Sequence, residues 1–219
     1  MKFINIHTHS SSNKATVLDI VNQYPASFDA TATHFSIGIH PWYINEGMLE
    51  EELKIIETKL QLTNCLALGE CGLDKRRETS IDIQLNVFEA QLLLAEKYQK
   101  PVIIHCVAAF QELIALKQKL NISVPMVIHG FSKNEQLAQQ LLKQGFYLSF
   151  GKYLIKNPEL KSVFISIPNE HFFLETDTIE EGIEQVYALA AKYKNTDVVT
   201  LQQIVTTNFN TVFKNGRMD

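Results

Sequence analysis

The chain alternates short apolar runs, rich in β-branched residues, with longer segments whose apolar residues recur at helical spacing. This alternation is typical of a parallel sheet covered by helices, because each strand is joined to the next by a crossover helix. The second run is ambiguous, since Val17, Ile20 and Val21 also fit one face of a helix. The runs predict eight strands, at residues 3–7, 16–22, 34–39, 65–70, 101–105, 125–129, 146–150 and 172–177.

Helical spacing predicts helices at residues 46–61, 80–99, 108–120, 134–144, 180–194 and near 200–213. It is clearest after Ser80, which suits a helix N-cap and precedes an apolar stripe that begins with Ile83 and Val87. Eight strands with helices between them predict an α/β fold of the (β/α)8 TIM-barrel type, and a doubly wound open sheet is the alternative. The first three strands are too close in sequence for two full crossover helices. We therefore expect a barrel that is short and irregular in its first units.

Length and composition indicate one globular domain, residues 1–219, because no linker, charge block or internal repeat divides the chain. The net charge of −4 gives the molecule no overall positive field. Any phosphate-binding surface must therefore be local or be supplied by bound metal.

Cysteine usage favours a reducing compartment. Cys65, Cys71 and Cys106 are odd in number and form no Cys-x-x-Cys pair, so a disulfide framework is not expected. Residues 1–20 contain no signal-peptide hydrophobic region, and no run approaches the ~18 apolar residues of a membrane span. The sequence predicts a cytoplasmic protein with no membrane partner, and no pattern in it indicates an obligate protein partner.

Ionisable residues stand where several of the predicted strands end. In a parallel barrel these carboxyl ends meet on the face that carries the active site. Each residue taken singly could be a hydrogen-bonded histidine or a polar cap, but six such placements together favour a metal site. Four histidines and two carboxylates suffice for two divalent metals if one carboxylate bridges them. The six residues are His7, His9, Glu70, His105, His129 and Asp177.

These strand ends lie within motifs that carry a family resemblance over nearly the whole chain. The motifs are "INIHTHS", "IGIHPW", "LGECGLD", "PVIIHC", "VIHGFS" and "LETD", with "NFNTVF" near the end. In this set and this order the sequence resembles the TatD-like deoxyribonucleases, which belong to the metal-dependent amidohydrolase-like barrels.

The resemblance implies a pair of divalent metals with Mg-supported activity, whereas histidine-rich ligation suits Zn or Mn, so the metals are Mg, Mn or Zn. It implies that His7, His9 and Asp177 hold one metal. It also implies that His105 and His129 bind the other metal and that the carboxylate of Glu70 bridges the two metals. Metal-bound hydroxide is then the nucleophile that attacks a phosphodiester phosphorus, and Asp177 can also accept the proton of the water. Glu70 and Asp177 are thus the residues expected to act in catalysis.

Other residues are candidates for substrate contact. His40 and Trp42 can offer a phosphate donor and a stacking surface for a base, or can belong to a packed aromatic loop. Flanking phosphates can be met by Lys75, Arg76 and Arg77, although a solvated charge run is the simpler interpretation.

Two further residues are candidates for supporting the metal ligands. Glu175 lies two positions before Asp177 and is either a partner for a ligand histidine or a buried carboxylate. Asn5 stands where the family usually has an acid, so Asn5→Asp is expected to retune the metal held by His7 and His9.

The sequence departs from the family pattern in ways that affect the substrate more than the metals. Val107 and Ala108 replace an Arg-Asp pair, Lys133 replaces a glycine, and the long loop expected after Asp177 is missing. We expect a metal-dependent phosphodiester hydrolase that acts on DNA, or on another phosphodiester, and trims DNA ends as an exonuclease.

Two alternatives remain open. One is an amidohydrolase-type enzyme for a small lactone, amide or phosphate ester. Such enzymes often bridge their metals with a carbamylated lysine, and no lysine ends a predicted strand. The other is a metal-binding barrel without catalytic activity.

Overall fold

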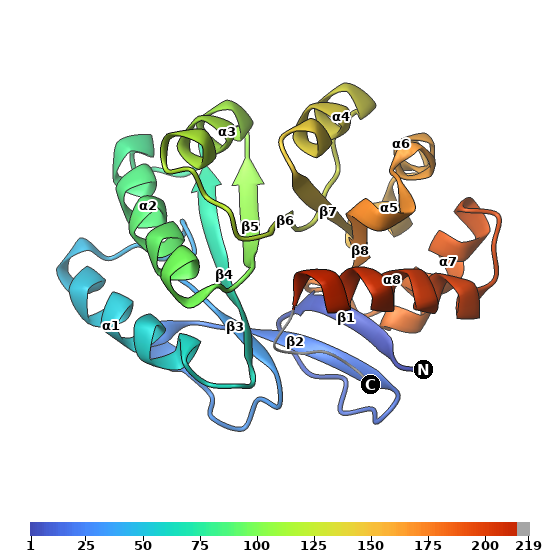
Figure 1. Cartoon of the computed structure of the whole chain (residues 1–219), viewed down its shortest axis with the longest axis horizontal. Helices are drawn as coiled ribbons and strands as arrows, with labels where there is room; N and C mark the ends of the chain where they lie inside the picture. The colour runs from blue at the N-terminus through green and yellow to red at the C-terminus, as the bar shows by residue number, and fades with distance from the viewer. Residues whose placement is uncertain (214–219) are drawn as a thin grey trace. The chain divides into compact units, whose positions relative to one another are not determined.

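The computed structural model describes residues 1–213, and its strands overlap the predicted apolar runs (Figure 1). All eight predicted strands are confirmed, including the ambiguous second one, and they follow one another in the sheet in chain order. The strand pairs run parallel. The strands are β1 Phe3–Thr8, β2 Val17–Gln23, β3 Phe35–Ile37, β4 Cys65–Asp74, β5 Val102–Val107, β6 Met126–Ile128, β7 Phe146–Phe150 and β8 Phe172–Leu174. Two ends differ most from the prediction: β4 continues past Glu70 to Asp74, and β8 ends at Leu174, three residues before Asp177.

The six predicted helices are also present, and Ser80 caps the second by accepting a hydrogen bond from Ile83 N at 3.3 Å. No α-helix separates β1 from β2 or β2 from β3, which confirms the irregular first units. Helical spacing did not predict α5 and α6, because both are short and Pro158 interrupts the pattern between them. The helices are α1 Leu49–Leu60, α2 Ile81–Tyr98, α3 Phe110–Lys119, α4 Glu135–Lys143, α5 Lys152–Lys156, α6 Leu160–Ser166, α7 Ile183–Tyr193 and α8 Val198–Val212, with 3-10 turns at η1 Pro25–Ser27, η2 Glu46–Met48 and η3 Asn169–His171.

The chain forms two compact units. Among the described residues, the first consists of Met1–Val21 with residues 128–213, and the second is Asn22–Val127. The boundaries fall inside strands β2 and β6 rather than in linkers. The predicted single domain over residues 1–219 stays a prediction.

In the first unit, the first and last strands lie next to each other. Thr8 and Asp177 form a parallel bridge, Asp177 N donates to His7 O at 3.0 Å, and His9 N donates to Asp177 O at 3.2 Å. Helices α7 and α8 pack on both strands. The hydroxyl of Tyr187 donates to Ile4 O at 3.1 Å and accepts from Ile4 N at 3.2 Å. The end of β1 is therefore held against the segment that follows β8.

In the second unit, β4 pairs with β3 and with β5, and α2 packs against it. Two buried glutamines of α2 hold main chain beside the sheet. Gln91 accepts from Ile39 N at 2.7 Å, and Gln84 accepts from Asp74 N at 2.7 Å. Gly72 has φ +139, and a Cβ there would lie 2.1 Å from His105 O. Only glycine allows β4 to approach β5 so closely at this point.

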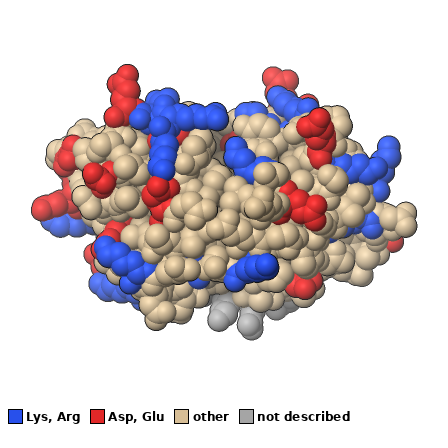
Figure 2. All heavy atoms as spheres, turned by 90° about the horizontal axis from the view of Figure 1, so that it is seen from above, with Lys and Arg blue, Asp and Glu red and all other residues tan. Residues whose placement is uncertain are grey.

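Within residues 1–213, no helix combines the length and the apolar character needed to cross a membrane. The face drawn in Figure 2 shows acidic and basic side chains interspersed.

Candidate metal site and substrate contacts

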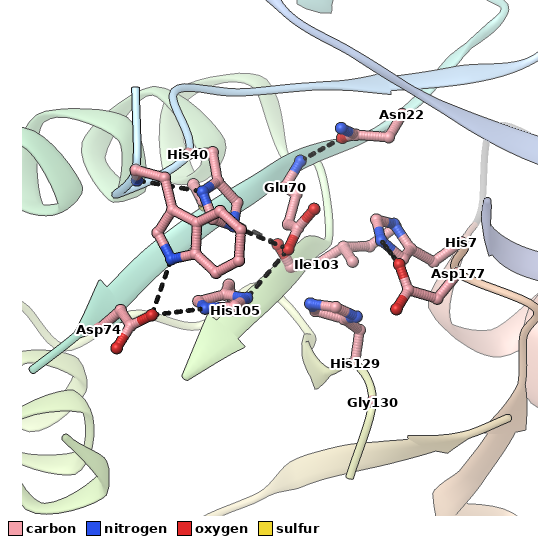
Figure 3. A network of polar contacts seen from close by, with 12 residues as sticks. His7, Asn22, His40, Glu70, Asp74, Ile103, His105, His129, Gly130 and Asp177 are labelled. Atoms are coloured by element: carbon pink, nitrogen blue, oxygen red, sulfur yellow. Dashed lines mark hydrogen bonds and ion pairs between the residues drawn. The ribbon is translucent and has the colours of Figure 1, made fainter. Parts of the chain in front are cut away.

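Three predicted metal ligands meet at the junction of β1 and the segment after β8. Nε2 of His7 lies 3.8 Å from Oδ1 of Asp177 (Figure 3), and Nε2 of His9 lies 3.4 Å from the same atom. His7 is fully buried, while the side chain of His9 is 31% exposed. Asp177 has φ +55, an uncommon conformation for an aspartate, and the bridge to Thr8 holds it there. Two imidazole nitrogens thus converge on one carboxylate oxygen.

His129, directly after β6, joins this group. Its ring centroid lies 4.4 Å from that of His7, and ligand atoms of His7, His129 and Asp177 all lie within 4.8 Å of one another. Oε1 of Glu175 faces Nδ1 of His129 at 3.5 Å and accepts from Gly130 N at 2.8 Å. A carboxylate that accepted a proton from Nδ1 would leave Nε2 as the nitrogen available to a metal. The expected metal shared by His105 and His129 stays a prediction, and the structure places His129 with His7 and Asp177.

In the second unit, two histidines converge on Glu70 of β4. Oε1 of Glu70 lies 3.0 Å from Nε2 of His40 and 3.0 Å from Nδ1 of His105 (Figure 3). The main chain of Glu70 is also fixed, because its N–H donates to Asn22 Oδ1 at 2.7 Å. Glu70 is buried, so these contacts are made with little competition from water.

The two histidines play different parts. Trp42 N donates to Nδ1 of His40 at 3.1 Å, so this nitrogen carries no proton. Nε2 of the neutral ring must then carry the proton and donate it to Glu70. His40 is therefore a hydrogen-bond donor to Glu70 in this structure, and its ligand atom lies with those of Glu70 and His105 in a group whose members are all within 4.8 Å of one another.

Asp74, at the end of β4, is a site residue that sequence reasoning missed. Its Oδ2 accepts from Trp42 Nε1 at 2.7 Å and faces Nε2 of His105 at 3.4 Å, while Oδ1 accepts from Arg76 N at 2.9 Å. Burial raises the pKa of Asp74, but the donors from Trp42, Arg76 and His105 outweigh it and hold the pKa below its ordinary value. Asp74 is thus a carboxylate at neutral pH. Its position four residues after Glu70, an even spacing in a strand, was the available signal.

The predicted substrate contacts lie around this group. Trp42 is 44% exposed, and the guanidinium of Arg77 lies over its ring at 4.6 Å from the centroid. Lys75 and Arg76 are also exposed, and Lys75 pairs with Glu112. Trp42 and Arg77 thus form a partly exposed aromatic surface with a cation beside it.

Asn5 contacts two polar side chains rather than a metal ligand. Its Nδ2 donates to Asp19 Oδ1 and to Thr176 Oγ1, both at 2.9 Å, and its Oδ1 accepts from Thr176 N at 2.9 Å. Asp19 also accepts two hydrogen bonds from Ser12. Asn5 therefore fixes the main chain next to Asp177, and sequence reasoning missed its partner Asp19.

The donor sets fit divalent metals. Each unit brings histidine nitrogens and a carboxylate to within 4.8 Å of one another. Imidazole suits Zn and other transition metals, while the carboxylates also suit Mg and Mn. In both units a further carboxylate, Glu175 or Asp74, faces the other nitrogen of a ligand histidine, which is the usual arrangement around metal-binding histidines.

Comparisons with known proteins agree with the residue motifs. The family model described as TatD related DNase matches residues 1–214. A *Bacillus subtilis* protein named "Uncharacterized metal-dependent hydrolase YabD" is 36% identical over 65% of this chain and 57% of its own length. An *Edwardsiella piscicida* protein named "3'-5' ssDNA/RNA exonuclease TatD" is 32% identical over 76% of this chain and 64% of its own length. The chain thus spans less than two thirds of these curated relatives.

A solved structure supports the fold. The *Escherichia coli* TatD homolog YJJV matches with a TM-score of 0.80 at 21% identity, covering 97% of this chain and 98% of that one. With eight strands in chain order and β1 beside β8, this similarity confirms the α/β TIM-type barrel and excludes the open-sheet alternative.

Proposed function

The chain belongs to the TatD related DNase family, and we propose that it is a metal-dependent hydrolase that cleaves phosphodiester bonds at the ends of DNA. The observation that carries the proposal is the convergence of Nε2 of His7 and of His9 on one oxygen of Asp177. The name of the *E. piscicida* relative, an exonuclease for single-stranded DNA and RNA, supports the substrate class.

Two divalent metals, Mg, Mn or Zn, belong to the proposal. His7, His9 and Asp177 would hold one metal, and the assignment of His105 and His129 to the other metal stays a prediction. When bound, such metals lower the pKa of a coordinated water and offset negative charge on phosphate oxygens. The bridging role of Glu70 stays a prediction.

The protein's own residues hold and move protons around these ligands. Nε2–H of His40 donates to Oε1 of Glu70 at 3.0 Å, which keeps that oxygen an anionic acceptor. Asp177 is the proposed proton acceptor for the nucleophilic water, and its side chain is 17% exposed, so water can reach it.

Substrate binding is assigned to the exposed surface of Trp42 and the adjacent basic residues. The indole provides a face for stacking a terminal base, and Lys75, Arg76 and Arg77 provide positive charge for flanking phosphates. Buried cysteines in a chain with net charge −4 are consistent with a cytoplasmic location, which stays a prediction.

Glu70→Gln tests the proposal, with Glu78→Gln at an exposed position as the matched control. Metal content and hydrolysis of an end-labelled single strand are measured beside a covalently closed circle of the same sequence. We expect Glu70→Gln to lose metal and nearly all hydrolysis, and Glu78→Gln to behave as wild type.

Other outcomes would contradict parts of the proposal. Cleavage of the circle as fast as the linear strand would exclude an end-directed enzyme. Turnover only of a lactone or small phosphate ester would assign the protein to small-molecule hydrolysis. Metal binding without turnover of any substrate would indicate a barrel without catalytic activity.

A further inference from the structure

One carboxylate oxygen is shared by a proposed metal ligand and the proposed stacking surface. Oδ2 of Asp74 lies 3.4 Å from Nε2 of His105 (Figure 3), and it also accepts from Trp42 Nε1 at 2.7 Å. The opposite nitrogen of His105, Nδ1, lies 3.0 Å from Glu70. The imidazole of His105 therefore connects Glu70 on one side with Asp74 on the other.

The indole of Trp42 is held from several directions. Asp74 fixes its Nε1 edge, Arg77 lies over its ring, and the main-chain N–H of Trp42 donates to His40. The rings of Trp42 and His105 are also in edge contact, with centroids 5.7 Å apart and planes at 77°. A change in the position of either ring alters the environment of the other through Asp74.

We propose that Asp74 is a positioning residue that couples the indole of Trp42 to the ligand nitrogen of His105. This inference rests on the proposed function insofar as it takes His105 as a metal ligand and Trp42 as a base-stacking surface. Nδ1–H of His105 can donate to Glu70 when no metal is bound, whereas a hydrogen bond from Nε2–H to Asp74 would leave Nδ1 unprotonated and available to a metal. Metal at His105 then changes the hydrogen bond that holds the indole, and with it the affinity of the indole for a base. By reciprocity, a base stacked on the indole changes the affinity for the metal by the same factor.

Asp74→Asn removes the shared oxygen while it preserves the local turn. The amide oxygen can replace Oδ1 as the acceptor for Arg76 N, a role that asparagine fills well. The amide NH2 group then stands in the place of Oδ2, where it faces two donors, the Nε1–H of Trp42 and the Nε2–H of His105. The substitution therefore disrupts the coupling rather than the end of β4.

Trp42 is the single tryptophan of the chain, so intrinsic fluorescence reports on this position alone. The experiment titrates Zn²⁺ into the metal-free protein and records both Trp42 emission and the dissociation constant by calorimetry. In wild type, Zn²⁺ changes the emission. In Asp74→Asn, affinity falls about 10-fold or more, in line with loss of a carboxylate partner of a ligand histidine, and the emission change disappears. Asp82→Asn, an exposed site in the first turn of α2, is the matched control and behaves as wild type.

Trp42→Phe gives a second, independent readout. It keeps an aromatic ring but removes the donor to Asp74, whose carboxylate then acts on His105 alone. Zn²⁺ binding at His105 becomes tighter, so the Trp42 and Asp74 variants shift affinity in opposite directions. If Asp74→Asn does not fold, the Trp42→Phe titration decides the question.

Two results overturn the coupling: a wild-type emission change in Asp74→Asn, or a Trp42→Phe variant with unaltered or weaker Zn²⁺ affinity. Failure of the proposed function gives a different pattern. A wild-type protein that shows the Zn²⁺-dependent emission change and the opposite affinity shifts, yet cleaves no DNA, retains the coupling and loses the nuclease assignment.

Discussion

The substitution Asn5→Asp distinguishes two possible roles of Asn5. One is to hold the strands through its hydrogen bonds, and the other is to tune the metal held by His7 and His9. In the wild-type protein the amide of Asn5 donates to Asp19 at 2.9 Å, at a position that is only 3% exposed. The substitution replaces this donor with a second carboxylate beside Asp19. Because two buried carboxylates in contact cannot both ionise, the pair keeps one proton in the folded state.

The cost follows from the pKa difference between the folded and unfolded states. An aspartic acid in the unfolded chain ionises about three units below pH 7, and each unit corresponds to about 1.4 kcal/mol. The variant is therefore less stable than wild type by up to about 4 kcal/mol at pH 7. The folded-state pKa is raised, so the destabilisation grows as the pH rises above the unfolded-state pKa. Between pH 7 and pH 5 the deficit shrinks by about 1.4 kcal/mol per unit.

Urea unfolding at pH 5, 6 and 7 measures this deficit. The matched control is the double variant Asn5→Asp with Asp19→Asn, which exchanges the amide and the carboxylate. Asn at 19 can accept from Ser12 N and donate to Asp at 5, so most of the stability returns. A deficit that does not change with pH, or a double variant as unstable as the single one, would refute the reasoning. Full stability with tighter metal binding would favour the role inferred from sequence.

Three further outcomes are expected. Gly72→Ala lowers the free energy of unfolding in urea by more than about 3 kcal/mol, since its Cβ would lie 2.1 Å from a carbonyl oxygen of β5. Gly145→Ala is the control, because a Cβ there would have no atom within 4 Å, and it lowers the free energy of unfolding by about 1 kcal/mol. Cys65 and Cys71 do not react with a thiol reagent at pH 8 until the protein unfolds. The reason is that burial raises the pKa of Cys65 to about 12 and that of Cys71 well above 9, so neither thiol ionises. Reaction of either thiol in the native state would contradict this prediction. Tyr187→Phe lowers the free energy of unfolding by about 1–2 kcal/mol, because main-chain groups of β1 lose a buried partner; an unchanged value would show that water replaces the hydroxyl.

The sequence by itself determined the order and approximate position of the strands, but not where β4, β5 and β8 end. Apolar runs with β-branched residues can be buried only as strands or helices, and their short length together with the helical segments between them selects strands. Ionisable residues such as His7, Glu70 and Asp177 can be found from the apolar runs that precede them, although β4 continues past Glu70 to Asp74 and β8 ends three residues before Asp177. The short spacing early in the chain likewise predicted the irregular first units.

Only the tertiary structure decided which polar groups meet. Asp177 lies beside His7 because β1 and the segment after β8 are neighbours, a contact between residues more than 160 positions apart, and His129 lies with both. Asp74 faces His105 because β4 pairs with β5 in a register that Gly72 permits. Local periodicity fixes the face on which a side chain lies, whereas strand register and closure depend on packing across the whole chain.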